Sequence, residues 1–214
     1  MARTAVIAGS TGLVGSQLLD KLLAGNVYSH VTELVRRAST RKHPKLSSVM
    51  ADFNDLSPLL PQLNADDAFC CLGTTQAAAG GRAGLERVDY HMVLEFARLA
   101  HRAGATRLFV VSSLGASLQS PSFYSRTKAR MEAAVAEIGF DTVQIVRPSL
   151  LLGERSESRP LEALGQRVAP LLAPLLRGPL AAYRAINAGD VADALLQLAA
   201  DGSARGLQIH TLPL

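Results

Sequence analysis

Short apolar runs alternate along the chain with longer segments in which apolar residues recur at helical spacing. The first run, "AVIAG" from Ala5, ends in a glycine, and apolar residues then recur with helical periodicity as far as Leu23. This pattern predicts a strand, a tight turn and an amphipathic helix. The same order returns along most of the chain, so strands are expected to alternate with helices.

Further apolar runs are expected to form strands at His30–Val35, Leu46–Ala51, Asp67–Gly73, Arg107–Ser113, Thr142–Pro148 and Gly206–Leu212. Periodicity predicts helices over Val88–Ala103 and from about Tyr124 to Ile138, each followed by a glycine, and a later helix capped by Asp190 that runs to Ala200. Continuous apolar strands are typical of a parallel sheet that is covered on both faces. The predicted fold class is therefore α/β, with a doubly wound parallel sheet of the Rossmann type.

A chain of 214 residues fits one domain, 1–214. Residues 149–186 are rich in Leu, Pro and Arg, and a small C-terminal substrate-pocket region is expected there because this fold commonly builds its pocket after the sixth strand. Pro170, Pro174 and Pro179 exclude one long regular helix over 167–183. The leucines of that stretch could line a pocket, form a dimer interface or complete the core.

Composition argues against several classes of protein. The net charge is +4, but the basic residues are spread out apart from a cluster over Arg36–Lys45, and aromatic residues are few, so no nucleic-acid partner is expected. The adjacent Cys70 and Cys71 do not fit a disulfide or a CxxC redox site, and the histidines lack metal-ligand spacing, so no metal is expected. The absence of a long apolar stretch or a signal peptide predicts a cytoplasmic protein that does not bind membranes.

The stretch "GSTGLVG" places Gly9, Gly12 and Gly15 at the turn between the first strand and the first helix. Free N–H groups and the positive end of the helix dipole at such a turn bind the pyrophosphate of a dinucleotide. The spacing is GxxGxxG, one residue longer in its first gap than GxGxxG. A plain turn is the alternative, but the position between strand and amphipathic helix favours a cofactor loop.

The residues after the second strand bear on the choice of cofactor. A site that prefers NAD usually has Asp or Glu about 20 residues beyond the glycines. Here Arg36 and Arg37 stand 21 and 22 residues past Gly15, which suits the 2′-phosphate of NADP(H) better than NAD(H). Glu33 could instead serve the ribose if the strand ends early, and the arginines could simply belong to a solvated loop.

The stretch "YSRTK" places Tyr124 and Lys128 one helical turn apart on the same face. A nearby ammonium lowers the pKa of a phenol and fits it for proton transfer. Ser112 and Ser113 end the fifth strand, where an α/β sheet presents groups to a ligand. A hydroxyl, a phenol and an amine could therefore converge beside a cofactor, although a surface pair of Tyr and Lys is the simpler alternative.

Three further motifs follow in order: "CLGTT" at 71–75, "VD" at 88–89 and "RPSLLLGERSESRP" at 147–160. With GxxGxxG and YxxxK, the chain resembles the extended and atypical short-chain dehydrogenase/reductases, above all their Tat-interacting-protein branch. The resemblance spans about residues 5–160 and, more loosely, 186–196. It implies an NAD(P)-binding Rossmann domain.

The resemblance also implies roles for individual residues. Tyr124 would be the general acid and base, Lys128 would bind the nicotinamide ribose and tune the tyrosine, and Ser113 would hydrogen-bond a substrate carbonyl. The cofactor-binding residues would be Gly9, Ser10, Thr11, Gly12, Leu13, Val14 and Gly15 at the pyrophosphate, Arg36 and Arg37 at the 2′-phosphate, Asp52 and Phe53 at the adenine, Leu72, Gly73 and Thr74 at the ribose and nicotinamide, and Pro148, Leu151 and Arg159 at the nicotinamide and phosphates.

Two positions depart from the family pattern. Ala8 stands where extended members often have Thr, and Asp89 replaces an Asn that is common at that helix start, so the resemblance does not establish a complete catalytic tetrad. The simpler interpretation of Asp89 is an ordinary helix cap. Cys70 and Cys71 are expected to pack in the core.

The first functional hypothesis is an NADP(H)-dependent oxidoreductase that acts on a carbonyl or hydroxyl substrate. The alternatives are a nucleotide-sugar epimerase, disfavoured by the short C-terminal part and the basic cofactor signal, and an NAD(P)H-sensing protein with a protein partner. By analogy with relatives, a homodimer would join the faces around Phe96 and Met131. The segment Thr74–Leu85 is small and glycine-rich, which fits a mobile flap over the nicotinamide.

Overall fold

The computed structural model describes residues 2–152 and 185–212, and its centre is one parallel sheet. The strand order is β3-β2-β1-β4-β5-β6-β9, so the chain winds outward from β1 in both directions. This is the predicted doubly wound Rossmann arrangement. The strands are β1 Arg3–Ala8, β2 Tyr28–Val35, β3 Leu46–Met50, β4 Asp67–Cys70, β5 Arg107–Val111, β6 Thr142–Pro148 and β9 Gly206–Leu212.

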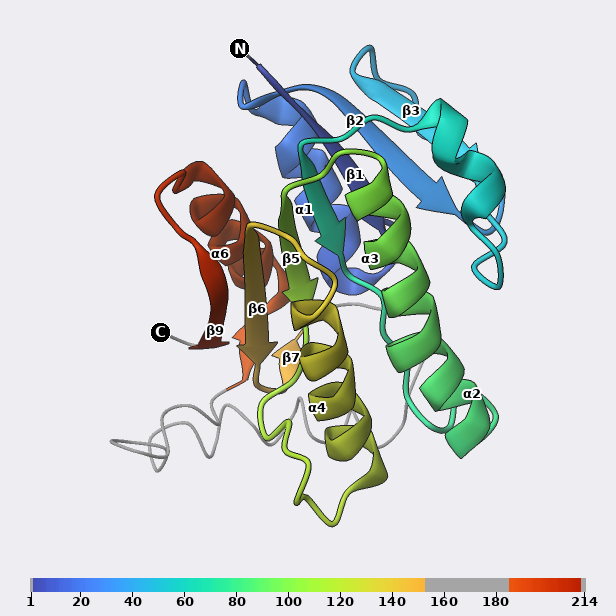
Figure 1. Cartoon of the computed structure of the whole chain (residues 1–214), viewed down its shortest axis with the longest axis vertical. Coiled ribbons are helices and arrows are strands. Elements are labelled where there is room, and N and C mark those ends of the chain that lie inside the picture. Colours follow the sequence, from blue (N-terminus) through green and yellow to red (C-terminus); the bar gives the residue numbers. More distant parts are fainter. Residues whose placement is uncertain (1, 153–184, 213–214) are drawn as a thin grey trace.

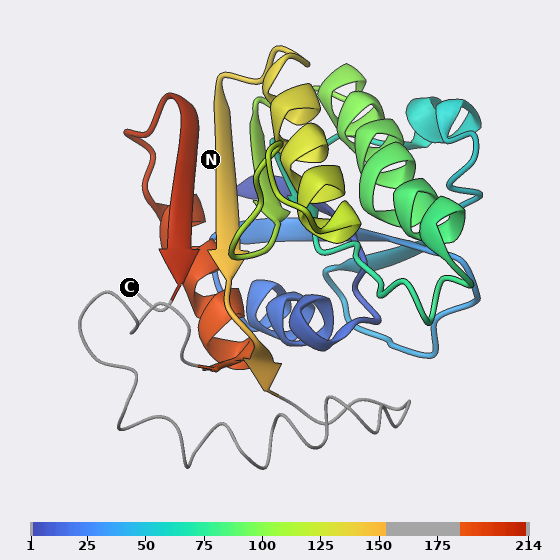
Figure 2. The same cartoon turned by 90° about the horizontal axis from the view of Figure 1, so that it is seen from below.

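Helices cover both faces of the sheet. Figure 2 shows α3 (Val93–Arg102) and α4 (Phe123–Ala136) on one side of the strands and α1 (Leu13–Ala24) and α6 (Ala188–Ala200) on the other. The arrowheads of β4, β5 and β6 point toward the lower part of Figure 1, near α4 and the short α2 (Arg82–Glu86). A parallel sheet presents ligand-binding groups at this carboxyl edge.

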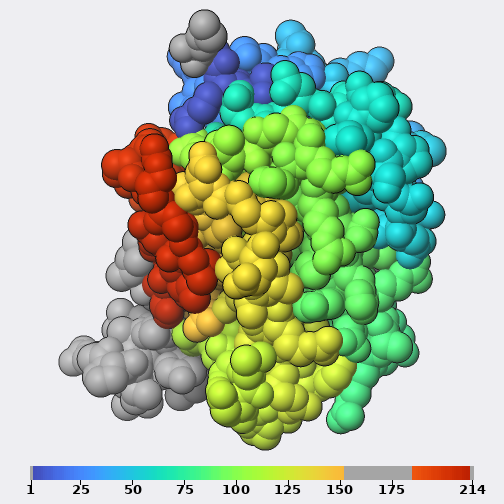
Figure 3. Space-filling view, in the orientation of Figure 1, coloured from blue at the N-terminus to red at the C-terminus, as the bar shows by residue number. Residues whose placement is uncertain are grey.

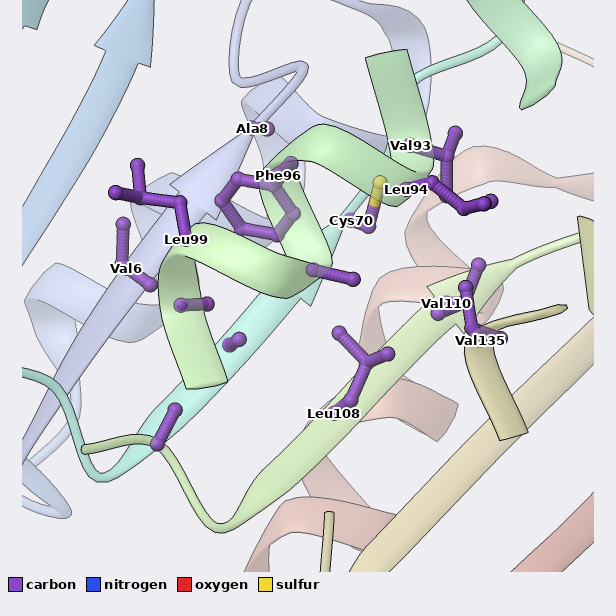
Figure 4. Close-up of a cluster of buried hydrophobic side chains, with 14 of the residues drawn as sticks. Val6, Ala8, Cys70, Val93, Leu94, Phe96, Leu99, Leu108, Val110 and Val135 are labelled. Atoms are coloured by element: carbon purple, nitrogen blue, oxygen red, sulfur yellow. The ribbon is translucent and has the colours of Figure 1, made fainter. Parts of the chain in front are cut away.

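Each face of the sheet has its own apolar core, because successive side chains of a strand point to opposite faces. Val6 and Ala8 of β1 pack toward α3 and α4, whereas Ile7 packs toward α1 and α6. Figure 4 shows Phe96 of α3 lying over β1 beside Cys70. Phe96 and Met131 are fully buried in this core, where they pack against the chain's own sheet and are not exposed to a second copy. A homodimer stays a prediction.

The strand predictions are confirmed in order and in approximate bounds. The single regular helix predicted over Val88–Ala103 is wrong, because α2 leads into a π-helical segment, η2 (Arg87–Met92), before α3 begins. Asp190 is not a cap, since Asn187 holds the N-cap position of α6 and Asp190 lies in its first turn. The sequence also gave no sign of the 3-10 helix η1 (Ser57–Gln62) or of the short parallel pair β7 (Leu151–Leu152) and β8 (Ile186–Asn187).

A buried polar cluster joins the amino ends of the strands. Asp67 accepts hydrogen bonds from Nε and Nη2 of Arg107 at 2.6 and 2.5 Å and from the Tyr28 hydroxyl at 2.5 Å. Arg3 lies 3.5 Å from the same carboxylate. Because Arg107 also donates to the carbonyl of Ala199, the cluster fixes the end of α6 to the sheet.

β9 is the last strand of the sheet order among the described residues, and its atoms lie at the surface on the face seen in Figure 3. Leu207 and Ile209 of β9 are 48% and 44% exposed. Over the described ranges, no helix combines the length and apolar character that crossing a bilayer requires.

Candidate cofactor-binding and catalytic site

The glycine loop joins β1 to α1 and depends on its glycines for two different reasons. Gly9 has a φ of +84°, and a Cβ on it would lie 2.6 Å from the carbonyl of Cys71. A Cβ on Gly15 would lie 2.1 Å from the carbonyl oxygen of Gly9, so both glycines are required by the fold itself. Gly12 is different, because its Cβ would meet only the Gly9 oxygen, at 3.3 Å.

Gly12 also occupies the N-cap of α1, and no side chain caps that helix. The amide groups of a first helical turn have no partner within the helix, and together with the helix dipole they favour an anion. The local geometry therefore fits a pyrophosphate at Gly12.

A cleft of about 880 Å³ opens at the carboxyl edge beside the glycine loop. It lies where β1 and β4 are neighbours and the winding of the sheet reverses, which is the usual ligand site in such sheets. Among the predicted cofactor residues, those in its lining are Gly9, Thr11, Gly12, Arg36, Asp52, Phe53, Leu72, Gly73 and Thr74.

Several lining residues were not predicted, among them Met50, Arg87 and Met92. Arg87 donates two hydrogen bonds, at 3.1 and 2.7 Å, to the side-chain oxygen of Asn54 and so links η2 to the loop after β3. No local pattern marks these residues, because their position depends on how distant segments pack. From the predicted flap, Ala78, Ala79 and Gly84 also line the cleft.

The basic cluster after β2 divides into groups with different surroundings. Arg36 and Arg37 follow β2 at once and are exposed, but only Arg36 is part of the cleft lining. Arg41 instead pairs with Asp20 of α1, and Lys45 donates to the carbonyl of Gly25 at 2.7 Å. Arg36 is therefore the cation of this cluster that the cleft offers to an anionic ligand.

Glu33 does not stand at the end of its strand, so the hypothesis that it serves the ribose is wrong. β2 continues to Val35, and Glu33 is 1% exposed. Its carboxylate accepts hydrogen bonds from the hydroxyls of Ser10 and Ser48, each at 2.6 Å. Burial alone would raise the pKa of Glu33, but these hydroxyls and the nearby Arg41 outweigh burial and lower it. Glu33 thus anchors the glycine loop from beneath.

The Tyr124 and Lys128 pair lies at the start of α4, which Ser122 caps by accepting the amide of Ser125. Tyr124 is half-buried, whereas the Lys128 side chain is 2% exposed, so the alternative of a surface pair is wrong. Burial by itself would lower the pKa of Lys128, but the Asp89 carboxylate and the Tyr124 phenol raise it above its ordinary value. The amine is therefore held as an ammonium.

Asp89 is fully buried inside η2 and is not a helix cap. One carboxylate oxygen lies 2.8 Å from Lys128 Nζ, and the other accepts the amide proton of Thr74 at 2.9 Å. A Cβ on Gly73 would lie 3.5 Å from Asp89 Oδ1, so the backbone after β4 passes directly over the ion pair. π-Helical turns occur often at functional sites, and this one directs a carboxylate at the lysine.

The two serines after β5 have different surroundings. Ser112 is buried and donates to Glu132 of α4, which also accepts hydrogen bonds from Arg147 at 2.9 and 2.5 Å. Ser113 is half-buried, and its hydroxyl donates only a long bond, 3.3 Å, to the carbonyl of Leu114. Ser113 is therefore the serine that can turn its hydroxyl to a ligand.

The remaining predicted residues lie apart from the cleft lining. Ser10 is buried against Glu33, and Leu13, Val14 and Gly15 belong to α1. Pro148 and Leu151 come at and after the end of β6, while Arg159 and the stretch 167–183 lie outside the described residues.

The model of a family described as NAD(P)H-binding matches residues 9–202. The chain belongs to this family. The NAD(P)H-binding chain is 37% identical to protein HTATIP2 of Rattus norvegicus over 169 residues, which cover 77% of this chain and 69% of the rat protein. It is 39% identical to protein fmp52-1, mitochondrial, of Aspergillus terreus over 177 residues, covering 79% of this chain and 75% of the fungal protein.

Solved structures agree on the fold of this NAD(P)H-binding protein. MoeE5 in complex with UDP-glucuronic acid and NAD superposes with a TM-score of 0.72 at 19% identity, covering 96% of this chain and 75% of MoeE5. Human epimerase family protein SDR39U1 with NADPH gives 0.64 at 17% identity, covering 99% and 75%. The predicted membership of the short-chain dehydrogenase/reductases, near the Tat-interacting-protein branch, is confirmed. Because the fungal relative is named as mitochondrial, a cytoplasmic location remains a prediction.

Proposed function

We propose that this NAD(P)H-binding protein is an NADP(H)-dependent oxidoreductase acting on a carbonyl or hydroxyl group. One observation carries the proposal: the backbone of Gly73 and Thr74 lines the dinucleotide-sized cleft on one side and covers the buried Asp89–Lys128 pair on the other. The candidate cofactor cleft and the lysine assigned to the nicotinamide ribose therefore share one wall.

The surroundings of the cleft fit a dinucleotide. The uncapped start of α1 at Gly12 would hold the pyrophosphate, and the exposed guanidinium of Arg36 would meet a 2′-phosphate, with Arg37 nearby. Asp52 and Phe53 would border the adenine. The resemblance assigns the nicotinamide half to Leu72, Gly73 and Thr74, which line the cleft, and to Pro148, Leu151 and Arg159, which are not among its lining residues.

The bound cofactor would supply or accept a hydride. Tyr124 would exchange a proton with the substrate oxygen, and the hydroxyl of Ser113 would hold that oxygen by a hydrogen bond. The ammonium of Lys128 would bind the nicotinamide ribose. Each of these groups comes from the carboxyl edge of the sheet, at the end of β5 or the first turns of α4.

Binding titrations of NADPH and NADH at matched salt test the cofactor assignment. We expect NADPH to bind at least about tenfold more tightly, a difference of about 1.4 kcal/mol, and Arg36→Ala to abolish this preference. Arg41→Ala is the matched control, because Arg41 is paired with Asp20 and is not part of the cleft lining. Equal binding of the two cofactors by the unaltered protein would contradict the 2′-phosphate assignment.

The two alternatives predict different results in the same experiments. A sensor would bind NADPH with the same preference, yet a screen of carbonyl compounds would give no turnover that Tyr124→Phe removes. An epimerase would act on a nucleotide sugar of the kind bound by MoeE5 and would retain its cofactor unchanged through each cycle. Turnover that consumes NADPH and depends on Tyr124 supports the oxidoreductase over both.

A further inference from the structure

The side chain of Asn54 joins two residues of the cleft lining, Asp52 after β3 and Arg87 of η2. Its amide nitrogen donates to Asp52 Oδ1 at 2.6 Å, and its amide oxygen accepts from Nε and Nη2 of Arg87 at 3.1 and 2.7 Å. The opposite orientation of the amide would point its NH2 group at a guanidinium, so the two neighbours fix which way Asn54 faces. One amide therefore holds a carboxylate and a guanidinium of the cleft together.

Both ends of this bridge keep a group for a ligand. A carboxylate accepts hydrogen bonds at two oxygens, and a guanidinium carries five N–H donors. The backbone and side-chain nitrogens of Asn54 both donate to Oδ1 of Asp52. Over residues 2–152 and 185–212, no hydrogen bond reaches Oδ2 of Asp52 or leaves Nη1 of Arg87. The bridge thus offers the cleft one acceptor and one donor.

The charge of Arg87 is also left to the cleft. The carboxylates that neighbour it in sequence are occupied, because Glu86 pairs with Arg130 of α4 and Asp89 pairs with Lys128. Within the part of the chain that the structure describes, no ion pair includes Arg87. Asn54, which holds Arg87 in place, is neutral. Arg87 is therefore a fixed cation whose charge no carboxylate cancels.

The apolar residues of the same lining suit a flat aromatic ring. Met50, the last residue of β3, is 66% exposed although it is apolar, and Phe53 and Met92 line the cleft with it. A thioether makes favourable contacts with aromatic rings. A planar base could therefore pack on these side chains while its edge meets polar groups.

We propose that Arg87, held by Asn54, selects adenine as the base of the bound dinucleotide. Adenine carries an exocyclic amine, which donates, beside ring nitrogens, which accept. The amine would donate to Asp52, and a neighbouring ring nitrogen would accept from Arg87. This inference rests on the proposed binding of NADP(H) and adds a specificity residue to that site. Asn54 is a positioning residue, because it acts through Arg87 and Asp52.

The hypoxanthine analogue of NADPH tests this selection, because it differs from NADPH at the base alone. An oxygen replaces the exocyclic amine, and the ring nitrogen N1 beside it carries a proton, so a donor becomes an acceptor and an acceptor becomes a donor. We expect the unaltered protein to bind NADPH at least about tenfold more tightly than the analogue, since the altered base sets an oxygen against Asp52. Titrations followed by nicotinamide fluorescence at matched salt measure both affinities.

Two variants then assign the preference to the bridge. Arg87→Ala removes the donor and should reduce the preference for NADPH over the analogue to about threefold or less. Asn54→Ala keeps both cleft residues but no longer fixes them, and should reduce the preference in the same direction. The control is Arg98→Ala, which removes an exposed arginine of α3 that pairs with Glu95 and is not part of the cleft lining, and should keep the full preference.

The inference is overturned if Arg87→Ala weakens the binding of both cofactors by the same factor, because Arg87 would then only support the shape of the cleft. It is also overturned if the unaltered protein binds NADPH and the analogue equally, a measurement that needs no variant. Both results leave the proposed oxidoreductase in place. A clear preference for adenine without any turnover of NADPH in the carbonyl screen would do the reverse, since it supports the role of Arg87 and removes the proposed reaction.

Discussion

Replacing Glu33 with glutamine is expected to weaken both the fold and the binding of a cofactor, because Glu33 holds the glycine loop from beneath. Its carboxylate accepts hydrogen bonds from Ser10 in the loop and from Ser48 in β3, each at 2.6 Å. Glutamine has nearly the same shape, but it has one acceptor oxygen and no charge. One hydroxyl must therefore turn or lose its partner.

The magnitude follows from the two hydrogen bonds. A bond to a charged group contributes about 1.5–3 kcal/mol and a neutral one about 0.5–1.5 kcal/mol, so two bonds that lose their charge should lower the free energy of unfolding by about 2 kcal/mol at neutral pH. A domain with about 5–15 kcal/mol of stability remains folded after such a loss. NADPH should also bind several-fold more weakly, because Ser10 is no longer fixed.

The effect of pH has a definite sign. Since the hydroxyls lower the pKa of Glu33 in the folded protein, the carboxylate stabilises the fold above its unfolded pKa, about 4.3, and this contribution is lost as the pH falls through the lower folded value. Glutamine does not ionise, so it makes no pH-dependent contribution to stability. The difference in stability between the two proteins should therefore be full at pH 7 and shrink below about pH 4.

Urea denaturation followed by circular dichroism measures this difference in stability at each pH. An NADPH titration measures the loss of affinity that is expected when Ser10 of the glycine loop is no longer fixed. Ser48→Ala serves as the control, because it removes one bond to Glu33 but leaves the bond to Ser10, and so it should reduce stability without reducing NADPH affinity. The reasoning is refuted if the free energy of unfolding of Glu33→Gln lies within about 0.5 kcal/mol of that of the unaltered protein at pH 7.

Two further predictions concern the fold around the site. Gly15→Ala would place a Cβ 2.1 Å from a carbonyl oxygen and should lower the free energy of unfolding by about 3 kcal/mol or more. Gly12→Ala, whose Cβ would have its nearest contact at 3.3 Å, should fold normally but bind NADPH weakly. Thermal melts and NADPH-binding titrations distinguish the two outcomes. Asp67→Asn removes the buried carboxylate that Arg107 contacts and should lower the free energy of unfolding, measured by urea denaturation, by about 3–5 kcal/mol. Asp193→Asn breaks an exposed ion pair and should change the free energy of unfolding by at most about 1 kcal/mol. Equal losses for Asp67→Asn and Asp193→Asn would show that burial does not govern these pairs.

The architecture was predictable from sequence because the central strands β1, β4 and β5 are buried on both faces and therefore appear as continuous apolar runs. The glycine loop was predictable because the requirement for glycine at Gly9 and Gly15 appears as a motif within seven consecutive residues. At both positions a Cβ would meet a backbone carbonyl. Arg36 follows from the end of β2 in the same way. All of these signals are local.

The chemistry beneath the cleft was not predictable, because it depends on contacts between distant segments. Asp89 meets Lys128 only through the π-helical segment, and a helix that widens by one residue cannot be distinguished from an α-helix by apolar periodicity. The sequence does not distinguish Arg41 from Arg36, because Arg41 meets its partner Asp20 only when α1 packs beside the loop after β2. The sequence does contain one local signal: Asp89 is a charged residue on an otherwise apolar helical face, and a carboxylate buried there needs a partner of opposite charge or a hydrogen-bond donor.

The contact between Gly9 and Cys71 has a mechanical consequence. The amide of Cys71 donates to the carbonyl of Ala8 at 2.9 Å, and the Gly9 backbone lies so close to Cys71 that no Cβ fits between them. The loop at the start of α1 and the segment through Gly73 and Thr74 are thus parts of one stiff backbone unit. Side chains around the cleft can change during evolution without altering the spacing between its two ends, so new substrates can be accommodated on an unchanged frame.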